Sequence, residues 1–387
     1  MINEMRQGFE TAYIDGSVVS NAAYRPQFVS NNHKEGKKVL SSIEDGLKLN
    51  PVQKVAFSLI QQDLRYIYTV IKYINPQESN YIPSMLPYLG VVVDGAEDWL
   101  KTIKNSSKCK FCMPLFNESQ TIFYEQIRNS IKMWQQDYNE IYMLLGSAYR
   151  KSDDYFGSVC KPIAKVLKLY DIYGMDTING VVCGNTILCH YYSSFFSYSA
   201  NNGEYIKAMS EIGGRYINLF NAMTDFQVNN ELQFSVQDYG GFIKSPVGNV
   251  YSDKFVLMSI LCQINFLLYG IEKWINNEIP TKLRFGYLLY YSLINVIEQI
   301  NEKLGIALKI NSRWKSDRFR NSMAHYKLGI VLKESDLIIS DAMFGLTEKI
   351  FGEDYYTVKK SIYKELEGLA KQIGKYLDLP QRMVYLQ

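Results

Sequence analysis

Histidine, proline and net charge are all scarce in this chain. It has 387 residues, but only 3 histidines and 10 prolines, and 42 basic side chains nearly balance 39 acidic ones for a formal charge of +3. Few prolines favour long helices. The small net charge excludes a strongly basic surface, so binding to a nucleic acid would depend on local patches. His33 lies in a polar stretch and His190 in an apolar aromatic one, which leaves His325 as the candidate for chemistry.

Signals for export and for membrane insertion are also missing from the sequence. Residues 1–6 lead straight into polar sequence, without the apolar stretch of a secretory signal. The most apolar run, residues 255–269, is short for a bilayer and contains Gln263 and Asn265, so we expect a buried core helix. With 6 cysteines and no export signal, we expect a reduced, cytoplasmic protein that has no membrane partner.

Cys109 and Cys112 form a Cys-x-x-Cys pair in a polar stretch. Such a pair can be half of a zinc site or a redox pair. A structural zinc would need two more ligands, and the candidates are Cys160, Cys183, Cys189 and His190. None of these supplies a second closely spaced cysteine pair. We therefore predict no metal site and no cofactor, and interpret these cysteines as buried or incidental thiols.

Helical periodicity is the main pattern that the sequence does contain. Apolar residues at helical spacing predict helices over residues 50–74, 94–103, 121–151, 155–169, 177–197, 204–223, 255–274, 280–304, 317–327, 341–351 and 355–377. Residues 77–90 are rich in proline, serine and tyrosine, and we expect a loop there. Glycine and proline punctuate residues 225–253, which predicts an irregular connection or a small hairpin. The predicted fold class is all-α.

The length of the chain suits two or three domains. A hydrophobic content of 47% with 21% charged residues is typical of a soluble globular protein. We divide the chain into an arm (1–48), a mostly helical region of unknown role with sensing or substrate recognition as candidates (49–250), and a helical bundle (251–387). Four principal helices in the last region are enough for one antiparallel bundle.

The residues that suggest chemistry lie on the short predicted helix 317–327. The polar residues before it can cap a helix, and Gly329 can end one. Asn321 and His325 are four residues apart and share one helix face. Arg320 can still reach His325 because its side chain is long and flexible. A cation for phosphate, an orienting amide and an imidazole that moves protons are the groups that cleave RNA through its own 2′-hydroxyl, without a metal.

The motif Arg320-Asn321-x-x-x-His325 resembles the Arg, four-to-six residues, His signature of HEPN-domain ribonucleases. The resemblance covers roughly residues 251–380 and implies a HEPN-like antiparallel helical bundle that pairs with a second copy, so that both motifs line one cleft. It implies Arg320 as the phosphate ligand, His325 as the proton-transfer or positioning residue, and Asn321 as the residue that fixes their geometry. Arg318 also satisfies the spacing, so either arginine can be the phosphate ligand.

From these observations we predict a metal-independent endoribonuclease that acts on RNA as a homodimer. The resemblance implies a role in prokaryotic defence or toxin–antitoxin growth arrest, under the control of an antitoxin-like or regulatory partner. A concerted cleavage is easier with two imidazoles, and a two-fold axis supplies the second one. The candidate substrate-binding residues around the motif are Lys315, Arg318, Tyr326 and Lys327.

Two alternatives stay open at the level of sequence. The bundle can be a non-catalytic HEPN-like module that dimerises or binds RNA. The motif can also be purely structural, with Arg320 paired to an acidic residue and His325 buried. The geometry separates these alternatives, because a nuclease needs Arg320 and His325 accessible in a concave site and not locked in a core.

Overall fold

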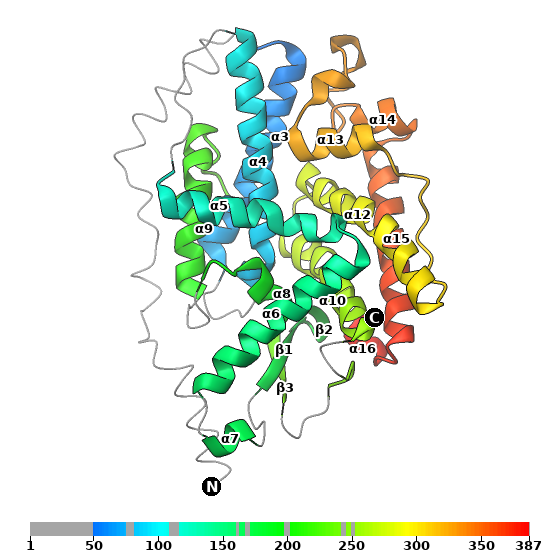
Figure 1. Ribbon diagram of the computed structural model, residues 1–387. Helices are drawn as coiled ribbons and strands as arrows, with labels where there is room; N and C mark the ends of the chain where they lie inside the picture. Colours follow the sequence, from blue (N-terminus) through cyan, green and yellow to red (C-terminus); the bar gives the residue numbers. More distant parts are fainter. Residues whose placement is uncertain are drawn as a thin grey trace.

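The computed structural model describes residues 49–74, 81–107, 116–159, 162–166, 171–196, 202–240, 245–248 and 252–386. Over these residues the chain is predominantly helical with one small sheet (Figure 1), which confirms the predicted all-α class. The predicted arm, residues 1–48, and the pair of Cys109 and Cys112 lie outside the described residues.

Two long helices, α3 (Pro51–Tyr73) and α4 (Tyr81–Ser107), begin the described part of the chain, and they pack against each other. The start of α3 is the one that the sequence predicts. The Asn50 side chain accepts a hydrogen bond from the backbone of Gln53, the Gln53 side chain accepts one from the backbone of Asn50, and Pro51 follows. This capping box satisfies N–H groups that have no partner inside the helix.

The first part of α4 corrects the predicted loop over residues 77–90. Pro83 lies in the first turn of the helix, where the missing N–H removes no helical hydrogen bond. Pro87 lies inside the helix, but Met85, Leu89 and Val92 around it are fully buried. Burial of these side chains outweighs the cost of one interior proline, which local propensity alone does not reveal.

The predicted long helix 121–151 is interrupted in the structure. It consists of α5 (Glu118–Ser130), a 3₁₀ turn η2 (Ile131–Gln135) and α6 (Tyr138–Val159). Asp137 restarts the helix, because its side chain accepts a hydrogen bond from the backbone N–H of Glu140 at 2.9 Å. The η2 turn directs Trp134 into the core, where its indole N–H donates to the hydroxyl of Tyr192, and leaves Gln135 on the surface.

A three-stranded antiparallel sheet takes the place of the first half of the helix predicted over residues 177–197, whereas the described residues of the helix predicted over 155–169 are mostly helical. The predicted segments contain the end of α6, α7 (Pro162–Val166), part of β1 (Asp171–Ile178), β2 (Val181–Asn185) and α8 (Thr186–Tyr192). The β1–β2 turn consists of Asn179 and Gly180, which both have positive φ angles, of 50° and 83°. This is the two-residue turn that joins tightly paired strands. The alternating residues near 233–237 form β3 (Phe234–Gly240), which pairs with β1, so the strand order is β2-β1-β3.

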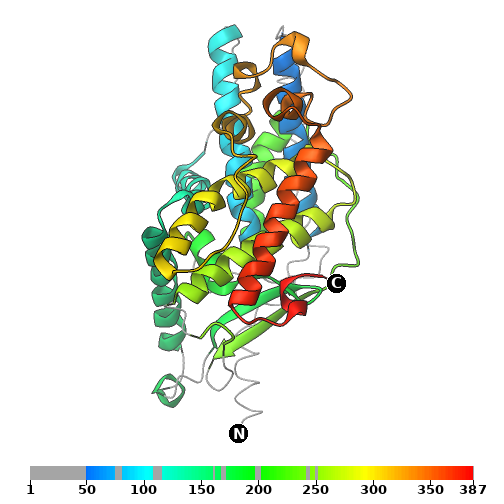
Figure 2. The ribbon, with the colours of Figure 1, turned by 90° about the vertical axis from the view of Figure 1, so that its right-hand side faces the viewer.

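The C-terminal helices follow the prediction closely. They are α10 (Asp253–Asn265), a π-helical turn η3 (Phe266–Ile271), α11 (Glu272–Trp274), α12 (Pro280–Leu304), α13 (Asp317–His325), α14 (Leu346–Phe351), α15 (Tyr355–Tyr376) and α16 (Gln381–Val384). Figure 2 shows α15 running along the outside of the fold to α16, which lies beside the sheet. Between α13 and α14 the chain forms two short 3₁₀ turns, η4 (Leu328–Ile330) and η5 (Glu334–Asp336).

One helical segment in the described part of the chain, Asp253–Trp274, is long and apolar enough to span a membrane, with a mean hydropathy of 1.7. Inside the fold, 94% of that window is buried. It contacts β2 and α15, so it is the buried core helix that its sequence predicts.

A single hydrophobic core includes residues on both sides of position 251. The helix α9 (Asn202–Leu219) covers α3 and α4, while α12 packs on α3 and α13 packs on α4. The division into residues 49–250 and 251–387 stays a prediction about domains. In the structure, however, the helix that bears the motif rests on helices from the first of these regions.

Candidate functional site

The helix α13 lies beside the upper part of α4 in Figure 1. The Ser316 side chain caps its start by accepting a hydrogen bond from the backbone of Phe319 at 3.3 Å. Phe319 and Met323 are buried and anchor the helix in the core. The helix ends at His325, two residues earlier than expected, because Tyr326 and not Gly329 adopts the left-handed conformation, with a φ of 51°.

A buried group of charged and polar residues holds this end of α13 from below. The Arg284 guanidinium on α12 forms an ion pair with Asp63 on α3 at 3.0 Å. It also donates hydrogen bonds to the carbonyl oxygens of Met323 and Ala324. The Tyr326 hydroxyl donates to Asp63 at 2.6 Å, and the guanidinium lies 4.4 Å from the centre of the Tyr326 ring. We call this the Asp63–Arg284–Tyr326 cluster.

The cluster accounts for the left-handed backbone of Tyr326, which is unfavourable for a residue with a bulky side chain. Two interactions of the ring and hydroxyl hold the residue in place, and the side chain is only 2% exposed. The expectation that Tyr326 binds substrate is therefore wrong, because its hydroxyl is committed to Asp63 inside the core.

Arg320 lies half-buried on the outer side of α13 and is held by two neutral oxygens. Its Nη1 donates to Oδ1 of Asn321 at 2.9 Å, and its Nη2 donates to Oε1 of Gln135 at 3.0 Å. Gln135 is the exposed residue of the η2 turn, so the interruption between α5 and α6 supplies this contact. Among the described residues, Arg284 pairs with Asp63 and Arg128 with Asp94, whereas no carboxylate forms an ion pair with Arg320.

His325 is half-buried, with 28% of its side chain exposed. Its Nδ1 is covered from solvent and lies 3.0 Å from Oδ2 of Asp98 on α4, although the two atoms are not aligned for a hydrogen bond. Lys327 shares the same carboxylate oxygen at 3.6 Å. Nothing in the local sequence links Asp98 to the motif, because the two helices meet only in the folded chain.

The pKa of His325 lies below its ordinary value. Burial is the largest cause and lowers it, the carboxylates of Asp98 and Asp94 raise it, and the cations of Lys327 and Arg320 lower it. The imidazole is therefore neutral at pH 7 and able to accept a proton.

Gly95 allows α4 to approach the end of α13 closely. A Cβ atom at this position would lie 2.5 Å from the carbonyl oxygen of Ala324 and 2.7 Å from the Tyr326 ring. Asp98 follows three residues later on the same face of α4. The close contact at Gly95 therefore brings the Asp98 carboxylate to His325.

The remaining predicted residues lie around the motif and differ in exposure and in their contacts. Arg318 and Lys315 are exposed, and Lys315 donates a hydrogen bond to Asn295 at 2.8 Å. Lys327 is half-buried and pairs with Asp98. The structure thus brings Arg320, Asn321, His325 and Lys327 to one end of the fold, together with Asp98 and Gln135, which the sequence did not predict.

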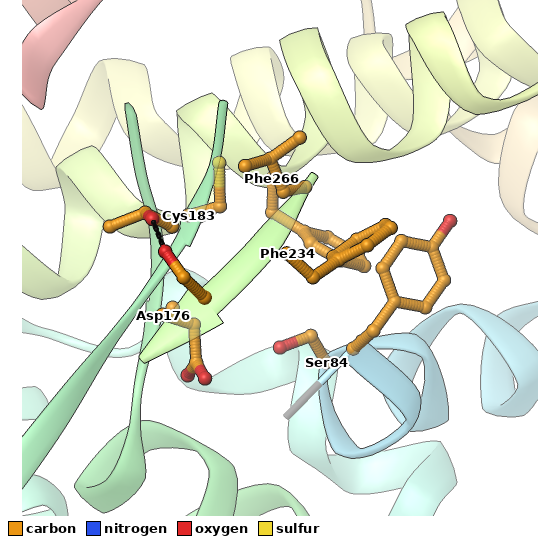
Figure 3. A pocket seen from close by; sticks show the side chains of 10 residues that line it. Ser84, Asp176, Cys183, Phe234 and Phe266 are labelled. Carbon is orange, nitrogen blue, oxygen red and sulfur yellow. Dashed lines mark hydrogen bonds between the residues drawn. The ribbon is translucent and has the colours of Figure 1, made fainter. Parts of the chain in front are cut away.

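A cavity elsewhere in the fold is too small to be a rival site. It lies between the sheet, the start of α4 and the π-helical turn, and Figure 3 shows among its lining residues Ser84, Asp176, Cys183, Phe234 and Phe266. Its volume of about 20 Å³ holds about one water molecule. A nucleotide or an organic cofactor does not fit there.

Among the residues that the structure describes, no group of three or more His, Cys, Asp or Glu side chains is placed to hold a metal ion. Comparisons of the chain with protein-family models, with curated proteins and with solved structures found no match. Its function is therefore inferred from the motif and from the geometry around it.

Proposed function

We propose that this protein is a metal-independent endoribonuclease that binds RNA at α13. Arg320 binds the scissile phosphate, and His325 takes the proton from the 2′-hydroxyl. The 2′-oxygen attacks phosphorus, the bond to the 5′-oxygen breaks, and the product carries a 2′,3′-cyclic phosphate. The motif histidine of a second copy of the chain, acting in its protonated imidazolium form, gives its proton to the leaving 5′-oxygen, so the proposal includes a homodimer.

The observation that supports this proposal most directly is the state of the Arg320 guanidinium. Gln135 and Asn321 fix it through neutral oxygens, so its positive charge is not cancelled. No further acceptor for its remaining N–H groups is present among the described residues, and an arginine binds phosphate oxygens through such paired donors. Arg318 is exposed, and no residue in the described part of the chain holds its guanidinium in a comparable way, which favours Arg320 as the phosphate ligand.

His325 has the properties that a general base requires. Its lowered pKa keeps the imidazole neutral, and part of the ring is accessible to a substrate. A purely structural motif would instead have Arg320 paired with an acidic residue and His325 locked in the core.

The biological setting in this proposal is prokaryotic defence or toxin–antitoxin growth arrest in the cytoplasm, with an antitoxin-like partner. The resemblance of the motif, and not the geometry, supports this part. Lys315, Arg318 and Lys327 are proposed as further contacts to the RNA backbone, since phosphate contacts from lysine and arginine add affinity without reading sequence.

The proposal is tested by RNA cleavage in EDTA with the full chain and a broad pool of cellular RNA. We expect cleavage that leaves 2′,3′-cyclic phosphate ends and falls at least 10²-fold in Arg320→Ala and in His325→Ala, the scale of a lost acid–base group. Arg382→Ala is the matched control, because it removes an exposed arginine from α16, at the opposite end of the fold in Figure 1.

Two outcomes would contradict the proposal. Equal cleavage by the wild type and by both motif variants would show that the activity arises elsewhere. A folded wild type that binds RNA but leaves it intact would favour the alternative function, a non-catalytic RNA-binding or dimerisation module.

A further inference from the structure

Asp98 has no part in the motif, yet it is the carboxylate nearest to the proposed base. Its Oδ2 lies 3.0 Å from Nδ1 of His325, which is covered from solvent. We infer that Asp98 is a positioning residue that keeps a proton on Nδ1 of His325 and leaves Nε2 free to accept the proton of the RNA 2′-hydroxyl. This inference rests on the proposed function.

The chemistry of the two groups gives the direction of the effect. A neutral imidazole carries one proton, on either nitrogen, and an ionised carboxylate can only accept hydrogen bonds. Beside the covered Nδ1, the carboxylate therefore favours the form with the proton on that atom. When Nε2 then accepts a proton, the same carboxylate stabilises the imidazolium, as the acidic member of a catalytic triad does. Imperfect alignment is common before a substrate binds.

The packing of α4 on α13 holds the two groups together. Gly95 lets the backbone of α4 reach the Ala324 carbonyl, and Asp98 lies one helical turn further along the same face. The Asp63–Arg284–Tyr326 cluster fixes the end of α13 that carries His325. The short distance between Asp98 and His325 is thus supported from both helices.

The other charged groups that influence His325 predict how it titrates. Asp98 and Asp94 raise its pKa, whereas Lys327 and Arg320 lower it. Asp98→Asn should therefore move the acidic limb of the kcat profile to lower pH. Lys327→Met should move it to higher pH. If Asp98 and Lys327 had only structural roles, the two substitutions would not move the acidic limb in opposite directions.

The decisive experiment is nitrogen NMR of the imidazoles in the full chain, with His325→Ala to assign the signal. We expect the proton on Nδ1 in the wild type and on Nε2 in Asp98→Asn. We expect kcat for RNA cleavage to fall at least 10²-fold in Asp98→Asn, with KM changed less than 3-fold, and Asp98→Glu to recover part of the loss. Glu97→Gln is the matched control, because it removes a carboxylate from the same helix that pairs with Lys101 instead.

The outcomes separate this inference from the proposed function. A proton on Nε2 in the wild type, or an unchanged proton position and kcat in Asp98→Asn, would overturn the role of Asp98 even if the wild type cuts RNA. If the wild type cuts no RNA, the NMR result still decides whether Asp98 sets the proton position on His325, while the ribonuclease proposal fails on its own assay.

Discussion

Two groups of charged side chains meet the end of α13, and they differ in burial and in charge compensation. In the Asp63–Arg284–Tyr326 cluster, Arg284 and Asp63 are 4% and 2% exposed, and the guanidinium also binds backbone carbonyls. In the pair of His325 and Asp98, the side chains are 28% and 30% exposed, and the imidazole is neutral. Each group joins this end of α13 to an acidic residue from α3 or α4.

The difference follows from the cost of burying charge. An ion taken out of water must be matched by an opposite charge and by hydrogen bonds, so removing one partner of a buried pair leaves an uncompensated charge in the core. A half-exposed pair keeps contact with solvent and can change protonation at lower cost. The buried cluster therefore holds α13 in place, and the half-exposed pair is the one that can change protonation in the proposed reaction.

The largest expected effect comes from removing one member of the buried cluster. Arg284→Met leaves the Asp63 charge buried and the last carbonyls of α13 without their donor. We expect the free energy of unfolding to fall by about 3–5 kcal/mol, the range for a broken buried ion pair, as measured by urea denaturation. The double variant Arg284→Met, Asp63→Leu is the control and should recover part of the loss, because no unpaired charge stays buried. A loss below about 1 kcal/mol would remove the distinction between the two groups.

A pH titration of stability sharpens the comparison, because it adds a second imidazole, His190, which is more deeply buried than His325. Burial lowers the pKa of His190 on α8 to about 4, against an ordinary value of 6.5. Between these values the unfolded chain binds more protons than the folded one, so stability falls as the pH decreases from about 6.5 to about 4. The shift corresponds to about 3 kcal/mol in total. His190→Gln should reduce the change in the free energy of unfolding with pH in this window. Urea denaturation at a series of pH values measures this change, and an equal change in the variant and the wild type would contradict the prediction.

The sequence predicted the parts of the fold that depend on local signals. Asn50 and Pro51 mark the start of α3, and Pro280 marks the start of α12, because a cap or a first-turn proline acts within a few residues. The hairpin turn at Asn179 and Gly180 is also a local signal, but it was missed because the apolar residues around it fit a helical repeat.

Other features could not be predicted, because they arise only when distant segments meet. Pro87 suggests a loop, yet burial against other helices keeps it inside α4. Within the candidate site, the motif gave Arg320 and His325, whereas Gln135 and Asp98 reach them from other helical segments. Their side chains are ordinary polar surface residues in the sequence, and a single sequence contains no record of such long-range contacts.

The smallest change in stability is expected for a substitution of His325, although the same substitution is expected to have one of the largest effects on the proposed RNA cleavage. His325→Ala removes a half-exposed side chain from the last position of α13 and leaves Asp98 in contact with Lys327. We expect the free energy of unfolding to change by less than about 1 kcal/mol, as for most substitutions near a surface, while RNA cleavage is lost. Lys371→Ala, which breaks an exposed pair with Glu367 on α15, provides the reference for a surface change. A loss in His325→Ala comparable to that in Arg284→Met would place the imidazole with the buried cluster and favour a purely structural motif.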